Sequence, residues 1–151
     1  MLVLNYANVG SASMTTVFDP SAVHRLEADT QSRPFVRSLV GTYQRMLMPR
    51  VDRVLDAVIA SDAEAALDAA LSLRVSSIMT GATELAEIAT FVIDDLRNHD
   101  LPAARAQALL LPGAALRADA ALEGYFRIHT IEHVPGPGDT VGAQSSNDSM
   151  R

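Results

Sequence analysis

Apolar residues recur at every third or fourth position through most of this chain, and this spacing limits the fold more than any other feature. The pattern runs through the stretches 34–59, 62–79 and 82–97 and resumes after Pro102. Such spacing gathers apolar side chains on one side of an α-helix. Alanine, leucine and valine supply most of them, whereas aromatic residues make up only 5% of the chain. Because alanine and leucine favour helices, the sequence predicts an all-α protein.

Residue types that start or end helices divide the chain further. Asp19–Pro20 is typical of an N-cap followed by proline at the first helical position, so we expect a short helix that covers one end of the molecule. In the stretch 34–59 the spacing of apolar residues continues across Pro49, which predicts one kinked helix. Ser61 or Asp62 caps the third helix, and Gly81 ends it.

The C-terminal part of the chain contains one more helical stretch, which extends from 102 to about 129. Pro112 and Gly113 interrupt it, so the stretch is either one kinked helix or two helices, and we expect the kinked helix. Beyond it, the segment Pro135–Gly138 leads into a polar end that cannot bury enough apolar surface to fold. We therefore expect this end to be a disordered tail.

Together these expectations define one architecture. The short connections favour an up-and-down antiparallel four-helix bundle with an extra short N-terminal helix and a long, kinked C-terminal helix. A chain of 151 residues is long enough for one such domain. We expect an N-terminal extension at 1–17, the helical bundle at 18–133 and the disordered tail at 134–151.

The composition excludes several classes of function. The net charge of −6, without a basic cluster, argues against nucleic acid or an anionic membrane as the partner. The chain has no cysteine, which excludes a disulfide, a thiolate zinc site and a cysteine nucleophile. Neither a signal peptide nor a membrane span is recognisable, so we expect a cytoplasmic protein. All twelve basic residues are arginine, which suggests a GC-rich bacterial genome.

The third helical stretch carries a motif. Residues 62–82 read Asp-Ala-Glu-Ala-Ala-Leu-Asp-Ala-Ala-Leu-Ser-Leu-Arg-Val-Ser-Ser-Ile-Met-Thr-Gly-Ala, and a helix rich in leucine and alanine follows. This stretch resembles the motif of histidine-containing phosphotransfer domains, Ala-His-x-Leu-Lys-Gly-Ser-Ser followed by Gly-Ala. The residues that match in register are Ala70, Leu73, Arg74, Ser76, Ser77, Gly81 and Ala82. The resemblance covers about 18–97 and implies a helical bundle in two-component signalling.

Two positions depart from the family pattern, and both carry its chemistry. Leu71 stands in place of the histidine that receives phosphate from a receiver-domain aspartate, and Val75 stands in place of the glycine that lets the receiver approach. A leucine side chain has no nucleophilic atom. The resemblance therefore implies a phosphorelay protein that does not accept phosphate and acts by docking a receiver or histidine kinase domain.

Helical geometry selects the candidate docking residues. Positions i, i+3, i+4 and i+7 share one side of a helix. The candidates on this side are Leu71, Arg74, Val75 and Ile78. We expect Leu71, Val75 and Ile78 to form an exposed apolar patch. The side that we expect to face the core carries Leu67, Ala70, Leu73 and Ser77.

An alternative function comes from the same residues. Leu71, Val75 and Ile78 are also suited to self-association, in which case the chain is a homo-oligomeric structural bundle, such as a homodimer, with no phosphorelay role. The sequence contains no convergent set of acid, base and nucleophile, so we do not expect an enzyme or a cofactor.

Several other residues are of types found in functional sites. His129, Glu132 and His133 spell His-x-x-Glu-His, a pattern that on a helix can bind zinc, but Pro135 follows so closely that we interpret them as a fraying helix end without a metal. His24 lies outside the motif and is interpreted as a surface or half-buried residue.

The remaining candidates are also interpreted as structural. His99 follows the C-terminus of a helix, where the helix dipole favours a cationic side chain, so we assign it a capping role. Ser76 and Ser77 are small residues that allow close helix packing. Methionine and tyrosine at helical spacing are typical of a core, and this interpretation covers Tyr43, Met46 and Met48.

Overall fold

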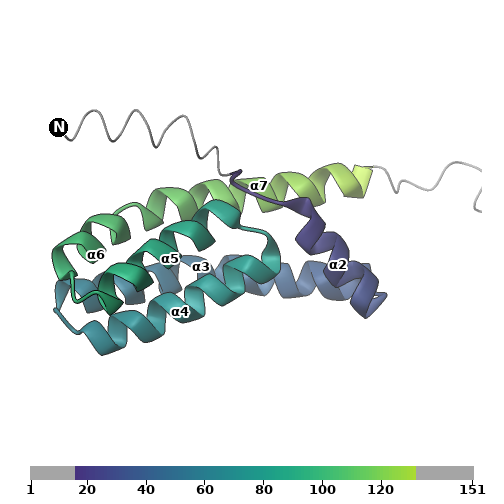
Figure 1. The fold of residues 1–151 in the computed structure, drawn as a ribbon. Helices are drawn as coiled ribbons and strands as arrows, with labels where there is room; N and C mark the ends of the chain where they lie inside the picture. Colours follow the sequence, from purple (N-terminus) through teal and green to yellow (C-terminus); the bar gives the residue numbers. More distant parts are fainter. Residues whose placement is uncertain (1–15, 132–151) are drawn as a thin grey trace, which may run out of the picture.

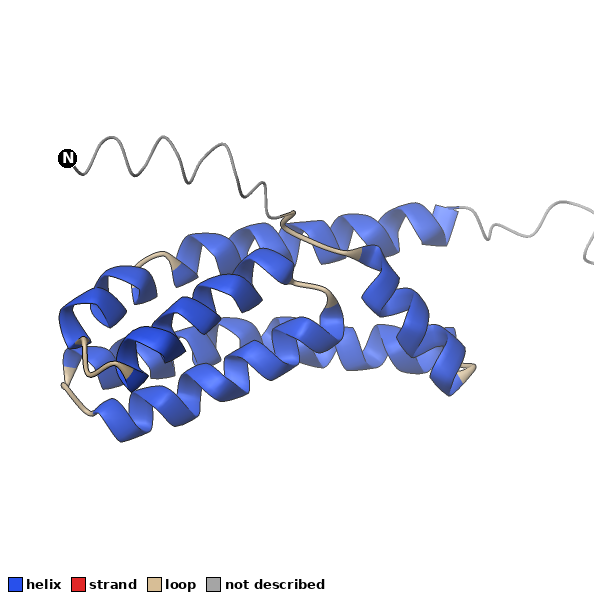
Figure 2. Cartoon of the chain, viewed as in Figure 1, coloured by secondary structure: helices blue, strands red, loops and turns tan. Residues whose placement is uncertain are grey.

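The computed structural model describes residues 16–131, and these residues form an all-helical protein without strands (Figure 2). In chain order the helices are α2 (Pro20–Thr30), α3 (Arg33–Ile59), α4 (Ala63–Thr80), α5 (Thr83–Arg97), α6 (Leu101–Ala108) and α7 (Leu111–Ile131). This confirms the predicted fold class. None of these helices is long and apolar enough to cross a membrane. Nearly all of the predicted extension at 1–17 and the whole predicted tail at 134–151 lie outside the described residues.

Side-chain caps fix where several helices begin. Four side chains each accept a hydrogen bond from a backbone N–H of the first helical turn, which would otherwise have no partner. They are Asp19, Ser32, Asp62 and Asp100, which cap α2, α3, α4 and α6. Asp62 rather than Ser61 therefore caps α4. Gly81 ends this helix with a left-handed φ of 85°, as its position in the sequence predicts.

Pro49 and Pro112 affect the helices in different ways. The chain continues through Pro49 as one helix, α3, as predicted. The expected long, kinked C-terminal helix is instead two helices, α6 and α7, separated by a turn at Leu109–Leu110. Proline fits best in the first turn of a helix, where its missing N–H costs no hydrogen bond. The break therefore falls before Pro112, which lies in the first turn of α7.

The helices pack in a closed order. α4 contacts α3 and α5, while α6 and α7 contact both α5 and α3. Figure 1 shows that these helices run beside one another and that α2 crosses one end, where it contacts α3 and α4. This is the end-covering position that we expect for the short N-terminal helix.

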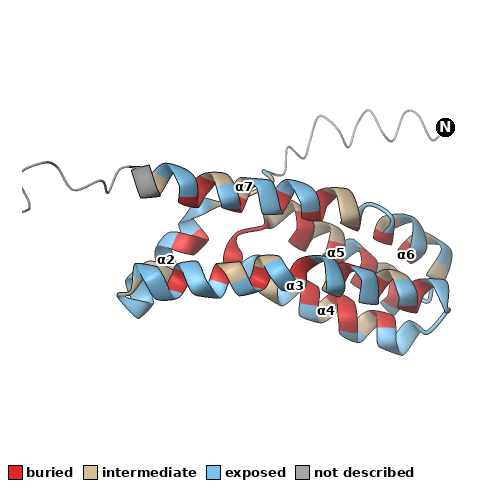
Figure 3. Ribbon diagram, turned by 180° about the vertical axis from the view of Figure 1, so that it is seen from behind, coloured by how far each residue is buried: buried red, intermediate tan, exposed pale blue. Residues whose placement is uncertain are grey.

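The core lies between the inward sides of the helices, where the buried positions gather (Figure 3). Its largest fully buried side chains include leucine or isoleucine from four helices, namely Leu47, Leu73, Leu85, Ile93, Leu111 and Leu122. Many alanines fill the space between them. Those without exposed surface are Ala66, Ala70, Ala82, Ala89, Ala104, Ala108 and Ala114. Small side chains let helices approach closely, so the alanine-rich sequence yields a core with few aromatic residues.

Candidate functional site

The outer side of α4 carries the predicted docking residues, but they are not equally exposed. Val75 and Ile78 are exposed. Leu71 is half-buried and packs against the core, and Arg74 is half-buried as well. The expected exposed patch is therefore present at Val75 and Ile78, whereas the expectation for Leu71 is wrong. Leu71 lies one turn after Leu67 and one turn before Arg74, along a flank of α4 that neighbouring side chains partly cover.

The opposite side of α4 faces the core, as predicted. Ala70, Leu73 and Ser77 are fully buried, and Leu67 is half-buried against the core cluster. The rotation of α4 about its axis thus follows from the spacing of its apolar residues.

Ser77 also has a polar contact that the sequence does not indicate. Its hydroxyl lies 3.0 Å from the hydroxyl of Tyr43 on α3, and both residues are buried. Burial raises the pKa of Tyr43, because the ionised phenolate would lose its hydration. Ser76 donates instead to backbone carbonyls of its own helix at Ser72 and Leu73. Neither serine is placed as a nucleophile, and Ser77 joins α3 to α4.

Two contacts define how α3 and α4 are aligned. The Tyr43–Ser77 hydrogen bond is one, and an ion pair of 3.9 Å between Nη2 of Arg53 and Oδ2 of Asp68 is the other. Along two antiparallel helices the residue numbers rise on one as they fall on the other, so residues at the same level have a nearly constant sum. The sums here are 120 and 121, so the register is constant between the two contacts. Met46 lies two helical turns before Arg53, and Val75 lies two turns after Asp68. Met46 and Val75 therefore lie at the same level on neighbouring helices.

This alignment extends the apolar surface from α4 onto α3. Leu39, Met46 and Arg53 are seven residues apart and share the exposed side of α3 from which Arg53 reaches Asp68 of α4. We define the α3–α4 face as its five exposed apolar residues, with exposed fractions of 37% for Leu39, 43% for Met46, 53% for Val75, 57% for Ile78 and 51% for Met79. The interpretation of Met46 and Met48 as core residues is wrong, because both are exposed, whereas Tyr43 is in the core as predicted.

A hollow of about 180 Å³ adjoins this face at the end that α2 covers. Its lining comes from α2 and from the last turns of α4, and consists of Ala22, Arg25, Leu26, Asp29, Ile78 and Met79. α2 is held there by Gly81, whose carbonyl oxygen accepts a hydrogen bond of 2.8 Å from the N–H of Asp19. A Cβ atom at position 81 would overlap the carbonyl oxygen of Asp19, so only glycine permits this close approach.

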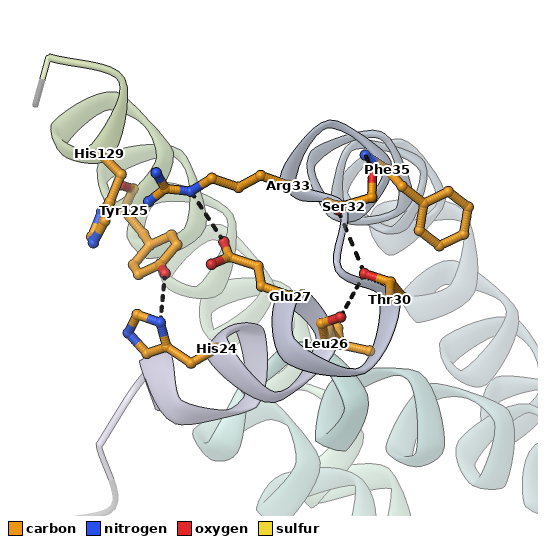
Figure 4. A network of polar contacts seen from close by, with 9 residues as sticks. All are labelled: His24, Leu26, Glu27, Thr30, Ser32, Arg33, Phe35, Tyr125 and His129. Atoms are coloured by element: carbon orange, nitrogen blue, oxygen red, sulfur yellow. Dashed lines mark hydrogen bonds and ion pairs between the residues drawn. The ribbon is translucent and has the colours of Figure 1, made fainter. Parts of the chain in front are cut away.

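The other side of α2 is attached to α7 by an aromatic and polar cluster (Figure 4). The Tyr125 hydroxyl lies 3.4 Å from Nδ1 of His24, and Nδ1 of His129 donates a hydrogen bond of 2.7 Å to the Tyr125 carbonyl oxygen. The rings of Tyr125 and His129 are stacked with 4.1 Å between their centroids. Burial raises the pKa of Tyr125, and the nearby carboxylate of Glu27 raises it further. Glu27 in turn pairs with Arg33 at 3.6 Å.

These contacts join His24 and His129 to Tyr125. His24 is exposed, in agreement with its interpretation as a surface residue, and His129 lies within α7, which continues to Ile131. Glu132 and His133, the other residues of the His-x-x-Glu-His pattern, lie outside the described residues. Between residues 16 and 131 no group of three or more potential ligands could hold a metal ion. The backbone N–H of His99 donates to the carbonyl of Leu96 at the end of α5.

Comparisons with protein-family models, with curated proteins and with solved structures give no significant match for this chain.

Proposed function

We propose that this chain is a docking module of two-component phosphorelay signalling that binds a receiver or histidine kinase domain without accepting phosphate. The closed order of α3, α4, α5 and the α6–α7 pair, with short connections, suits an up-and-down antiparallel four-helix bundle with α2 as the extra helix. That is the architecture implied by the resemblance of residues 62–82 to histidine-containing phosphotransfer domains.

The α3–α4 face is the observation that carries the proposal. Its exposed apolar side chains extend over two neighbouring helices, and Val75 lies one turn from Leu71, which occupies the position of the phosphate-accepting histidine. A contiguous exposed apolar surface on a small protein usually marks an interaction site. Because Leu71 offers no nucleophile, the interaction ends at binding.

The first prediction is that charges on this face abolish docking. The double variant Val75→Asp/Ile78→Asp should bind receiver or kinase domains from the same genome at least about tenfold more weakly, because each aspartate would be desolvated in the complex. Both positions are exposed in the free protein, so the variant should still unfold cooperatively. Isothermal titration calorimetry with phosphorylated and unphosphorylated receivers measures the binding, and circular dichroism measures the folding.

Leu116→Asp is the matched control. Leu116 is 64% exposed on α7, which lies diagonally across the closed helix order from α4, so its replacement should leave docking unchanged. Equal losses in both variants would contradict a specific docking face.

Self-association through the same face is the competing function. Sedimentation velocity distinguishes the two. A parent chain that forms dimers, binds no receiver or kinase domain, and becomes monomeric on Val75→Asp/Ile78→Asp substitution would support a homo-oligomeric structural bundle instead.

A further inference from the structure

The chain's only sulfur atoms belong to methionine, and two of them lie on the α3–α4 face. The sequence contains six methionines and no cysteine. Met46 and Met79 are on this face, on α3 and α4 respectively. Met48 is also exposed on α3, but a separation of two residues from Met46 places it about 200° around the helix, on another side. Met1, Met14 and Met150 lie outside the described residues.

Both methionines on the face are placed where a partner would cover them. Met46 lies level with Val75 across the α3–α4 contact, and Met79 lies one turn after Val75 and lines the hollow beside α2. The flexible, polarisable thioether is suited to a surface that adapts to a partner. Their exposed fractions of 43% and 51% leave both residues open to a small solute before a partner binds.

We propose that Met46 and Met79 are oxidation sites through which hydrogen peroxide closes the α3–α4 face to its partner, an inference that rests on the proposed function. In this reaction the thioether sulfur attacks one oxygen of the peroxide. A sulfur–oxygen bond forms as the oxygen–oxygen bond breaks, and the departing hydroxide takes up the remaining proton as water. The sulfur loses two electrons to the peroxide, and the product is methionine sulfoxide.

The product is poorly suited to an apolar interface. A sulfoxide oxygen is a strong hydrogen-bond acceptor, and burying it without a donor costs free energy. At position 46 the oxygen would lie on α3 at the level of Val75, and at position 79 it would lie at the hollow that α2 lines with Ala22, Arg25, Leu26 and Asp29. Oxidation on either helix thus adds a polar atom to the surface that docking buries. Methionine sulfoxide reductases reverse the modification, so the change can act as a switch.

The test uses the full chain and a receiver or kinase domain that binds it. The chain is treated with hydrogen peroxide, the oxidant is removed, and peptide mass spectrometry measures oxidation at each methionine before the binding titration. Oxidation at Met46 and Met79 should weaken binding by about tenfold, and methionine sulfoxide reductase should restore the original affinity.

Two variants make the result specific. Met46→Leu/Met79→Leu should keep through the same treatment whatever affinity it shows before treatment, because leucine has no sulfur to oxidise. Met48→Leu is the matched control and should remain as sensitive as the parent.

The outcomes separate this inference from the proposed function. If the untreated parent binds no receiver or kinase domain, the proposed function fails and the inference fails with it. If the parent binds, and still binds equally well when mass spectrometry shows both methionines oxidised, the inference alone is wrong. The inference is also wrong if peroxide treatment weakens binding by the Met46→Leu/Met79→Leu variant as much as binding by the parent.

Discussion

At the scale of single residues, Tyr43 and Ser77 are a polar pair built into a core of aliphatic side chains. Their hydroxyls are 3.0 Å apart and both residues are buried, so removing one hydroxyl leaves the other without this partner. We predict that Tyr43→Phe lowers the free energy of unfolding by about 1–2 kcal/mol, the usual cost of an unpaired buried hydroxyl. Urea denaturation followed by circular dichroism measures the change.

A double-mutant cycle isolates the contribution of this hydrogen bond. Tyr43→Phe/Ser77→Ala removes both hydroxyls, so it should destabilise the protein by clearly less than the sum of the two single changes. The Thr80 hydroxyl also lies near the Tyr43 hydroxyl and can remain its partner when Ser77 is replaced. Ser77→Ala should therefore lower the free energy of unfolding by less than Tyr43→Phe does. Strictly additive changes would mean that the two hydroxyls are not coupled.

At the scale of elements, the position of α2 depends on the residue that ends α4. Gly81 has a left-handed φ of 85°, and a side chain there would overlap the backbone of Asp19 at the start of α2. We predict that Gly81→Ala lowers the free energy of unfolding by more than about 2 kcal/mol, since left-handed backbone strain adds to the steric overlap. Amide hydrogen exchange should increase most strongly in α2, which loses its contact with α4.

Gly124→Ala provides the contrast within the same protein. Gly124 lies inside α7, and a Cβ atom at this position meets no atom within 4 Å. The substitution should raise the free energy of unfolding by about 0.5–1 kcal/mol, because alanine favours helices more than glycine does. Similar losses of stability in both variants would contradict the special role of Gly81.

The elements also show which features the sequence predicts. The caps at the starts of α2 and α4, the glycine end of α4 and its core-facing side depend on neighbouring residues in the chain, and the sequence predicts them. The half-burial of Leu71 and the exposure of Met46 depend instead on where α3, α4 and their neighbours pack, and local spacing does not contain that information. The division between α6 and α7 was one of two forms that the sequence allowed.

At the scale of the whole molecule, the α3–α4 face and the hollow beside it are products of three helices that meet at one end. α2 supplies four of the six residues that line the hollow, and it is fixed there by Gly81 on one side and by the cluster around Tyr125 on the other. The proposed docking surface therefore depends on the contacts that hold α2 as well as on Val75 and Ile78. Loss of the α2 attachment should weaken docking even when the face itself is unchanged.

The same scaffold allows a direct test of the proposed relation to phosphotransfer domains. The double variant Leu71→His/Val75→Gly places a nucleophilic imidazole on α4, one turn from the guanidinium of Arg74, which can offset part of the phosphate charge. Val75 is exposed, so its removal leaves no cavity, and glycine costs the helix about 1 kcal/mol or less relative to valine. We predict that a phosphorylated receiver transfers phosphate to this variant, less to Leu71→His alone, and none to the parent.

Mass spectrometry under conditions that preserve phosphohistidine measures the transfer and identifies the modified residue. Leu116→His places an exposed imidazole on α7, away from the α3–α4 face, and should stay unmodified. Phosphate on His24 of the parent would show that another histidine has taken over the reaction. A folded double variant that binds receivers but remains unmodified would mean that docking does not bring the receiver aspartate to position 71. In that case the α3–α4 face binds its partner in an orientation unlike that of phosphotransfer domains, because the imidazole and the phosphoryl group must come within bonding reach for transfer to occur.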